Sequence, residues 1–362
     1  MSCLGGRASM ETRITELFGI RHPIMLAGMS SVATPDLVAS VCNGGGLGIL
    51  ACASLSAEQA RADISQIRSL TDKSFGINIT AMNPGVRELT RVAIEEKVPV
   101  FNFGLGRMTE AIKAVHEYDG KVIATVALLK HALRAEQDGV DALNVTGHEA
   151  AAHGAAVTSL VLIPAVAGRV KIPVLGAGGF CNGQGLAAAL ALGAEGISMG
   201  TRFVVTKESP VHERIKQAII NATEEDTIYS NRHDGMPGRV LKAKASEAIE
   251  KRGYRLVEGL TNALRVRRML RISYWELLAS AFHMAKAEKI GISMLSFRAI
   301  AQARLLKAVE DGDLLEKGFI YAGQDCGQIS DIPSCSELME QIVAEAEEVL
   351  EVTRHRSGKT IK

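Results

Sequence analysis

The stretch from Ile172 to Phe203 reads IPVLGAGGFCNGQGLAAALALGAEGISMGTRF. It predicts a strand (Ile172–Leu175), a glycine turn, a helix (Gln184–Leu192) and a second strand (Gly196–Met199) that ends in Gly200-Thr201. Glycines after both strands leave backbone N–H groups exposed, and such groups bind phosphate. In a (β/α)8 barrel the phosphate site commonly follows strands seven and eight. The stretch therefore predicts this fold and a phosphorylated ligand.

Apolar strand candidates recur before this stretch, with helical patterns between them. The eight candidates are Ile24–Ala27, Leu47–Leu50, Phe75–Ile79, Val98–Phe101, Lys121–Thr125, Ala142–Val145, Ile172–Leu175 and Gly196–Met199. A doubly wound sheet is the competing fold, but no GxGxxG fingerprint follows the first strand. We therefore expect an α/β fold with a TIM (β/α)8 barrel over residues 10–205.

The character of the chain changes after the barrel. Residues 206–320 are charged and helical in pattern, with no clear strand, and predict an appended helical lid domain. Residues 321–362 predict a turn and a final helix that packs back on the barrel wall. That helix begins at a capping box formed by Ser334 and Glu337.

Composition excludes several classes of protein. The net charge is +1, which gives no reason to expect nucleic acid or an acidic membrane as partner. The six cysteines form no CxxC pair, so we expect no metal site and a cytoplasmic location. The uncharged run over residues 173–194 is broken by glycines, Asn182 and Gln184, so it does not predict a membrane span.

Polar side chains at strand ends are the first candidates for chemistry. His148 and His153 follow the sixth predicted strand, where either could bind an anionic substrate or act as a base, or else bond loop backbone. The position favours a functional role, more for His153 than for His148. Asn78 ends the third strand and either caps a turn or bonds a ligand. We expect solvated side chains at His131, His212, His283 and the basic run Arg265–Arg268.

Six short motifs occur in the order found in one known family. They are His22-Pro-Ile-Met25, Gly45-Gly-Leu-Gly48, Gly76-Ile-Asn78, Gly147–His153, Gly176-Ala-Gly-Gly179 and Met199-Gly-Thr-Arg-Phe203. The chain thus resembles the nitronate monooxygenase family of FMN-dependent barrels. That family also includes NADH:quinone reductases and FMN-dependent enoyl-acyl-carrier-protein reductases. The resemblance extends to the final helix and includes Ala322-Gly-Gln324.

The resemblance implies an FMN site across the barrel mouth. The phosphate would lie on Gly178-Gly179 and Gly200-Thr201, and the ring near Ala27, Gly28, Met29 and Asn78. Thr125, Gly147 and Gly176 complete the implied cofactor set. His153 matches the active-site histidine that binds or protonates the substrate, and Gln324 is a further implied substrate contact.

The resemblance leaves the reaction open. Nitronate oxidation with O2, giving a carbonyl compound and nitrite, is the leading expectation. An NAD(P)H-dependent reductase of quinones or enoyl thioesters is the alternative, because Gly200–Ser209 looks like the enoyl reductases. A non-catalytic flavin-binding scaffold and an IMP-dehydrogenase-like barrel with Cys181 as nucleophile also remain open. We expect a small-molecule substrate, and a homodimer is left open.

Two departures from the family pattern lie beside the implied flavin. Ala151 and Ala152 stand where the family commonly has glycines, and alanine would narrow the pocket. Ala124-Thr125 stands where several members carry a lysine at the end of the fifth strand. Both departures bear on the reaction rather than on FMN binding.

Overall fold

The structure is a computed structural model that describes residues 10–81, 85–151, 153–252, 273–275 and 292–356. Eight parallel strands pair in the order β1-β8-β7-β6-β5-β4-β3-β2, and a bridge between Met25 and Leu47 brings the two ends together. The strands are β1 Ile24–Leu26, β2 Gly48–Ala51, β3 Phe75–Thr80, β4 Val100–Gly104, β5 Lys121–Val126, β6 Ala142–Thr146, β7 Val174–Ala177 and β8 Ile197–Met199. The predicted barrel and its eight strands are confirmed, with strand ends shifted by a few residues.

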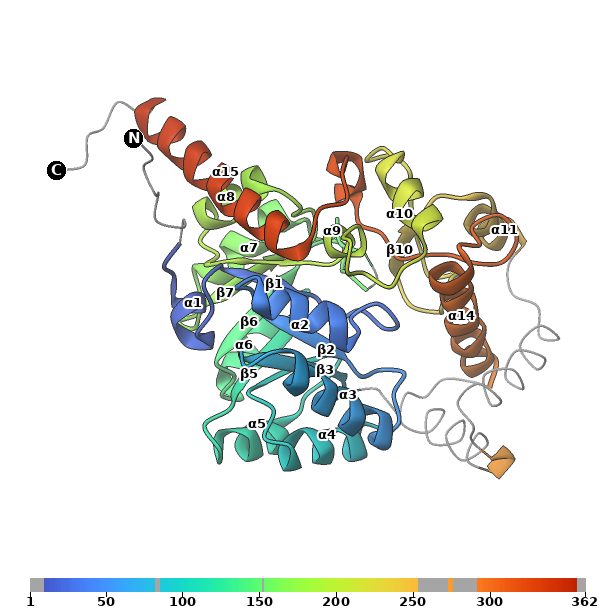
Figure 1. The fold of residues 1–362 in the computed structure, drawn as a ribbon, viewed down its shortest axis with the longest axis horizontal. Helices are drawn as coiled ribbons and strands as arrows, with labels where there is room; N and C mark the ends of the chain where they lie inside the picture. Colours follow the sequence, from blue (N-terminus) through green and yellow to red (C-terminus); the bar gives the residue numbers. More distant parts are fainter. Residues whose placement is uncertain (1–9, 82–84, 152, 253–272, 276–291, 357–362) are drawn as a thin grey trace.

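Helices cover the outside of the barrel (Figure 1). They are α2 Pro35–Asn43, α3 Ala57–Leu70, α4 Val86–Glu95, α5 Thr109–His116, α6 Leu129–Gln137, α7 Ser159–Ala167 and α8 Gly183–Ala191, with the short α9 Thr201–Val204 after β8. A capping box starts α3, because the Ser56 hydroxyl accepts from the Gln59 backbone N–H and the Gln59 side chain accepts from the Ser56 N–H. His131 on α6 is exposed, as predicted.

An apolar layer fills the lower part of the barrel interior. It consists of Met25, Leu47, Ile49, Val100, Ile123, Ala142 and Leu175. Helix α1 (Arg13–Phe18) covers this layer from the N-terminal ends of the strands, through Ile14 and Phe18. That end of the barrel is therefore packed shut, so the opposite end is the one available to a ligand.

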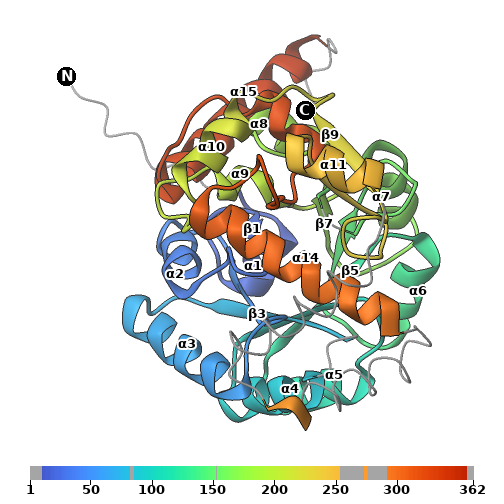
Figure 2. The ribbon, with the colours of Figure 1, turned by 90° about the vertical axis from the view of Figure 1, so that its right-hand side faces the viewer.

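The other end of the barrel carries the lid region (Figures 1 and 2). Its described elements are α10 Glu213–Ile220, β9 Thr227–Ser230, β10 Gly238–Leu241, α11 Lys244–Arg252 and α14 Ile292–Asp311. Helix α14 crosses the barrel face in Figure 2, and its Gln302 side chain donates to the Ser31 hydroxyl in the loop after β1. The lid region thus lies over the mouth.

The prediction that residues 206–320 are helical, with no clear strand, is wrong at one place. Strands β9 and β10 form an antiparallel hairpin in which Tyr229 faces Arg239. Each strand has four residues, too few for a clear alternating pattern in sequence. His212 is also not solvated, because it is half-buried and caps α10 by accepting from the Arg214 N–H. Arg265–Arg268 and His283 lie outside the described residues.

The C-terminal segment returns to the barrel as predicted. A 3-10 helix, η1 (Gln324–Gln328), leads to α15 (Cys335–Arg356), which packs on α8. A Cβ on Gly183 would lie 2.5 Å from the Ala346 backbone nitrogen, so only glycine permits this approach. Ser334 and Glu337 form the predicted capping box. Among the described residues, no helix has the length and apolarity that a membrane crossing requires. The domain boundaries and the cytoplasmic location stay predictions.

Candidate active site

A layer of small and polar side chains lies above the apolar layer, at the carboxyl ends of the strands. Most members lie two positions after a residue of the apolar layer, so their side chains point to the same side of the barrel wall. The layer consists of Ala27, Ala51, Asn78, Asn102, Thr125, Asn144, Ala177 and Ser198, none of them charged. We call these residues the floor of the site. The sequence predicted Ala27, Asn78 and Thr125 but missed Asn102, Asn144 and Ser198.

Hydrogen bonds connect the polar half of the floor. The Asn78 side chain donates to Asn102 Oδ1 over 2.6 Å, and Asn102 donates to Thr125 Oγ1 over 3.1 Å. Asn144 donates to the same threonine oxygen over 3.3 Å. Two buried atoms of the floor, Asn144 Oδ1 and Ser198 Oγ, have no hydrogen-bond partner. Because such atoms are costly in a protein interior, they indicate the place of a polar ligand.

The loop after β1 closes onto the floor. A Cβ on Gly28 would lie 2.5 Å from Asn78 Cβ, so the backbone can approach Asn78 only without a side chain. A Cβ on Gly200 would lie 3.3 Å from Met29 Sδ and 3.9 Å from Ala27 Cβ. The structure therefore brings together the residues after β1 and in β3 that the resemblance assigns to the flavin ring, with Gly200, which it assigns to the phosphate, beside Met29.

The turn after β7 contains Gly178 and Gly179, which the resemblance assigns to the phosphate; we call this the phosphate end of the site. Gly178 and Gly179 have φ values of +92° and +82°, which glycine adopts with little strain. A Cβ on Gly178 would lie 3.0 Å from Ala150 Cβ and 3.1 Å from the Gly147 carbonyl oxygen. The turn thus lies against the loop after β6. Gly176, by contrast, lies within β7 rather than in the turn, and a Cβ there would lie 2.9 Å from Ile163 Cδ1 of α7, so its predicted contact with the cofactor stays a prediction.

The segment before η1 packs against the loops that follow β6 and β8. The Thr201 hydroxyl accepts from the Gly323 N–H over 2.9 Å, and the Gln324 N–H donates to the Glu149 carbonyl over 3.0 Å. Gln324 therefore lies at the phosphate end, where it lines a hollow of about 400 Å3 together with Gly178 and Gly179. Its predicted contact with substrate stays a prediction.

Asp325 is a buried acid in this region that the sequence did not reveal. Burial raises the pKa of its carboxyl to about 7, although the Asp325 N–H, the Arg202 charge and the Thr201 hydroxyl oppose the change. Asp325 is thus an acid that can change its protonation near neutral pH. No sequence pattern singles it out, since its burial depends on the return of the C-terminal segment.

His153 lies under the lid, about one quarter exposed. Its Nε2 is 3.2 Å from Asp234 Oδ2, and its Nδ1 is 3.3 Å from the Pro237 carbonyl oxygen. The Tyr321 hydroxyl donates to the same Asp234 oxygen over 2.7 Å. Burial would raise the pKa of Asp234, but hydrogen bonds from His153, Met236 and Tyr321 outweigh it, and the pKa is lowered. The carboxylate is therefore ionised beside the histidine.

His148 has a structural role instead. Its Nδ1 is 2.9 Å from the Ala155 carbonyl oxygen, and its ring meets the edge of Tyr229 at a centroid distance of 4.4 Å. Arg239, which is buried, donates to the His148 carbonyl and stacks over the Tyr229 ring. These contacts fix the loop after β6 to the β9–β10 hairpin. Ala151 lies in that loop, and Ala152 lies outside the described residues.

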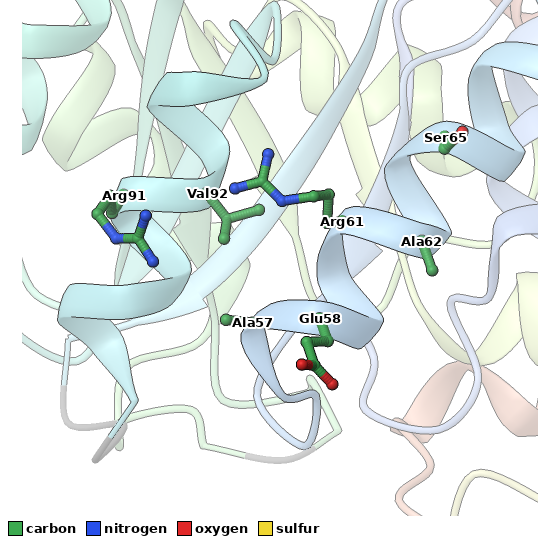
Figure 3. A pocket seen from close by; sticks show the side chains of 7 residues that line it. All are labelled: Ala57, Glu58, Arg61, Ala62, Ser65, Arg91 and Val92. Carbon is green, nitrogen blue, oxygen red and sulfur yellow. The ribbon is translucent and has the colours of Figure 1, made fainter.

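Two other features, the thiol of Cys181 and a hollow on the outer wall, do not indicate a catalytic site. Cys181 is buried and burial raises the pKa of its thiol to about 12, so it lacks the thiolate that a nucleophile needs. A hollow of about 470 Å3 lies between α3 and α4 on the outer wall (Figure 3). Arg61 and Arg91 on its rim pair with Glu95, so its charges are already matched.

The residues present fit FMN. At one end of the site, the glycines of the turn after β7 face the loop after β6. Two buried polar atoms without a hydrogen-bond partner, Asn144 Oδ1 and Ser198 Oγ, lie in the floor. A flavin carries N–H and carbonyl groups on its ring, which are the partners that an amide oxygen and a hydroxyl require. Gly28 has no side chain between its backbone and Asn78, so the loop after β1 lies close to the floor.

Known proteins resemble this chain along most of its length. The model of the family described as nitronate monooxygenase matches residues 11–345. A Mycobacterium tuberculosis protein named (3aS,4S,5R,7aS)-5-hydroxy-7a-methyl-1-oxo-octahydro-1H-indene-4-carboxyl-CoA dehydrogenase is 36% identical over 342 residues, covering 93% of this chain and 96% of the relative. A probable nitronate monooxygenase of Staphylococcus aureus is 31% identical over 285 residues, covering 66% and 80%. The structure of FabK from Thermotoga maritima matches with a TM-score of 0.79 at 35% identity, covering 96% of this chain and all of that chain.

Proposed function

This chain belongs to the nitronate monooxygenase family, and from that premise we propose that it is an FMN-dependent oxidoreductase acting on an acyl thioester. Membership establishes an oxidoreductase with a TIM barrel. The cofactor and the substrate class are the proposal.

The FMN part of the proposal rests on the floor and the phosphate end. Gly178, Gly179, Gly200 and Thr201 would hold the phosphate, and Asn78 with Asn144 would bond the ring. When bound, FMN supplies the two-electron oxidation or reduction of the substrate. The chain itself binds the substrate, excludes water through the lid and holds the proton that is exchanged.

The observation that favours a thioester is the neutrality of the site. The floor carries no charged side chain, and its Thr125 stands where several members of the family have a lysine. The positive charge that His153 can carry is matched by Asp234 at 3.2 Å. A nitronate is an anion and needs an unmatched positive charge, whereas a thioester carbonyl is neutral and needs only a hydrogen-bond donor.

The relatives support the same substrate class. The name of the Mycobacterium tuberculosis protein specifies a carboxyl-CoA, which is a thioester, and that protein matches this chain over 93% of its length. We propose that this chain exchanges two hydrogens at the carbons α and β to the thioester carbonyl, by removal in one direction and addition in the other. In either direction one hydrogen moves as a proton, and we assign its exchange to His153, which lies under the lid. NAD(P)H would be the reductant in the direction of addition.

Nitronate oxidation is the second candidate. It is favoured by the Staphylococcus aureus relative, named a probable nitronate monooxygenase, which matches two thirds of this chain. The two candidates differ in the charge of the substrate, so the same protein can be tested on both.

The test is a comparison of kcat/KM on two substrates by purified, FMN-loaded protein. We expect turnover of an enoyl-CoA with NADH or NADPH, and kcat/KM for an alkyl nitronate with O2 lower by about a hundredfold or more. His153→Ala should lower thioester turnover by about a hundredfold or more, because it removes the proton donor. His131→Ala, an exposed histidine on α6, is the matched control and should leave turnover unchanged. Efficient nitronate turnover without thioester turnover would refute the proposal.

A further inference from the structure

Asp234 is a buried carboxylate with several donors and lies in the turn between β9 and β10. Its Oδ2 accepts from His153 Nε2 at 3.2 Å and from the Tyr321 hydroxyl at 2.7 Å, and its Oδ1 accepts from the Met236 N–H at 2.9 Å. The residue is 9% exposed. A buried carboxylate with this set of donors is held in one orientation, and its charge must be matched nearby.

His153 faces an acceptor at each ring nitrogen. Nε2 faces the Asp234 carboxylate, and Nδ1 faces the Pro237 carbonyl oxygen at 3.3 Å. Neither partner can donate, and a neutral imidazole has one N–H. Both contacts are hydrogen bonds only when the ring is protonated. The ring is thus held between two acceptors, and the longer Nδ1 contact is the easier one for a substrate to replace.

The other titratable groups around Asp234 do not supply a positive charge to pair with its carboxylate. His233, next to Asp234 in sequence, is buried, at 3% exposed. Burial lowers the pKa of His233, and the Arg304 charge on α14 lowers it further, while Glu250 on α11 and Asp234 oppose the change. His233 is thus neutral near pH 7. Of the groups that lower the pKa of Asp234, His153 is the one that can carry a charge of opposite sign.

We propose that Asp234 and Tyr321 are positioning residues that hold His153 in the orientation in which it donates a proton. The Asp234 carboxylate accepts the Nε2–H of His153, and the Tyr321 hydroxyl fixes that carboxylate by donating to it. The proton on Nδ1 is then the one delivered: the Nδ1–H bond breaks, a bond to hydrogen forms on the substrate, and the ring becomes neutral while Nε2–H stays on Asp234. The use of this proton rests on the proposed function, whereas the pairing of His153 with Asp234 does not.

The test is an NMR titration of histidine ring signals in the FMN-loaded protein, with the His153 signal assigned by its loss in His153→Asn. In Asp234→Asn we expect the titration midpoint of His153 to fall by roughly one pH unit or more, because the nearby negative charge is gone. Tyr321→Phe keeps the ring that packs against His153 at 6.0 Å and removes the hydroxyl, so a smaller fall is expected. Asp226→Asn is the matched control, since Asp226 precedes β9 and pairs with Lys242 and Thr223 rather than His153.

The pH profile of thioester turnover gives the second readout. In Asp234→Asn we expect kcat to fall by about tenfold to a hundredfold with little change in KM, and its alkaline limb to move to lower pH. An unchanged His153 midpoint in folded Asp234→Asn would overturn the inference. If Asp234→Asn does not fold, an unchanged midpoint in Tyr321→Phe overturns it equally. A shifted midpoint in a protein that turns over no thioester would leave the inference standing and refute the proposed function instead.

Discussion

Replacing Gly178 by alanine tests whether the turn after β7 is built for a ligand. The residue has φ +92°, where an alanine is strained by about 1–2 kcal/mol. Its new Cβ would lie 3.0 Å from both Cβ and N of Ala150 and 3.1 Å from the Gly147 carbonyl oxygen, and such crowding costs about 1–3 kcal/mol. Two of the three crowded atoms belong to the backbone, so the turn must move.

We expect this movement to weaken the binding of FMN more than it lowers the stability of the folded protein. If about 2–4 kcal/mol of the strain is relieved by displacing the turn, the Kd for FMN should rise by about thirtyfold to a thousandfold. The assay is titration of apo-protein with FMN, followed by the change in flavin fluorescence, together with thermal unfolding of the apo-protein.

Gly193→Ala is the matched control for backbone strain. Gly193 also has φ +92° and would bring a Cβ to 3.1 Å from Ala167 Cβ, but it lies after α8 and away from the mouth. This variant should lose stability while keeping the FMN affinity of the unaltered protein. A Gly178→Ala protein that binds FMN within about threefold of the unaltered protein would refute the phosphate site at this turn.

Two further predictions concern buried polar groups. The folded-state pKa of Asp325 is raised from 3.8 to about 7, so its contribution to stability is complete below about pH 4 and is lost as the pH rises through 7. Urea unfolding at about pH 5 and about pH 8 should therefore show a loss on the order of 3 kcal/mol that is absent in Asp325→Asn; parallel curves for the two proteins would contradict this. Asn102→Leu removes the acceptor at 2.6 Å from the Asn78 amide and should lower both thermal stability, by about 1–3 kcal/mol, and FMN affinity. Unchanged FMN affinity in that variant would show that Asn78 does not need Asn102 for its orientation.

The barrel could be predicted because its signals are local. Each strand is a short apolar run followed by a helix with recognisable caps, such as Ser56 with Gln59 in α3. The floor could have been predicted more fully. Asn102 interrupts the apolar run Val100-Phe-Asn-Phe-Gly104 two residues after inward Val100, just as Asn78 follows Gly76, and period-two counting along each strand would have found it.

The surroundings of His153 could not be predicted in the same way. Asp234 and Tyr321 lie far along the chain from His153 and meet it only because the β9–β10 hairpin and the C-terminal segment fold over the mouth. Isolated acids and tyrosines in a charged stretch carry no local signal that separates a buried partner from a solvated side chain. Asp325 was missed for the same reason, since its burial is a property of the assembled fold.

The proposal that this chain oxidises or reduces acyl thioesters with FMN is tested most directly by anaerobic spectroscopy of the purified, FMN-loaded protein. We predict that a saturated alicyclic carboxyl-CoA thioester, or NADH followed by an enoyl-CoA, changes the visible flavin absorbance within a single turnover. An alkyl nitronate should change it far more slowly. Rapid bleaching by the nitronate, with no response to either thioester, would contradict the proposed substrate class.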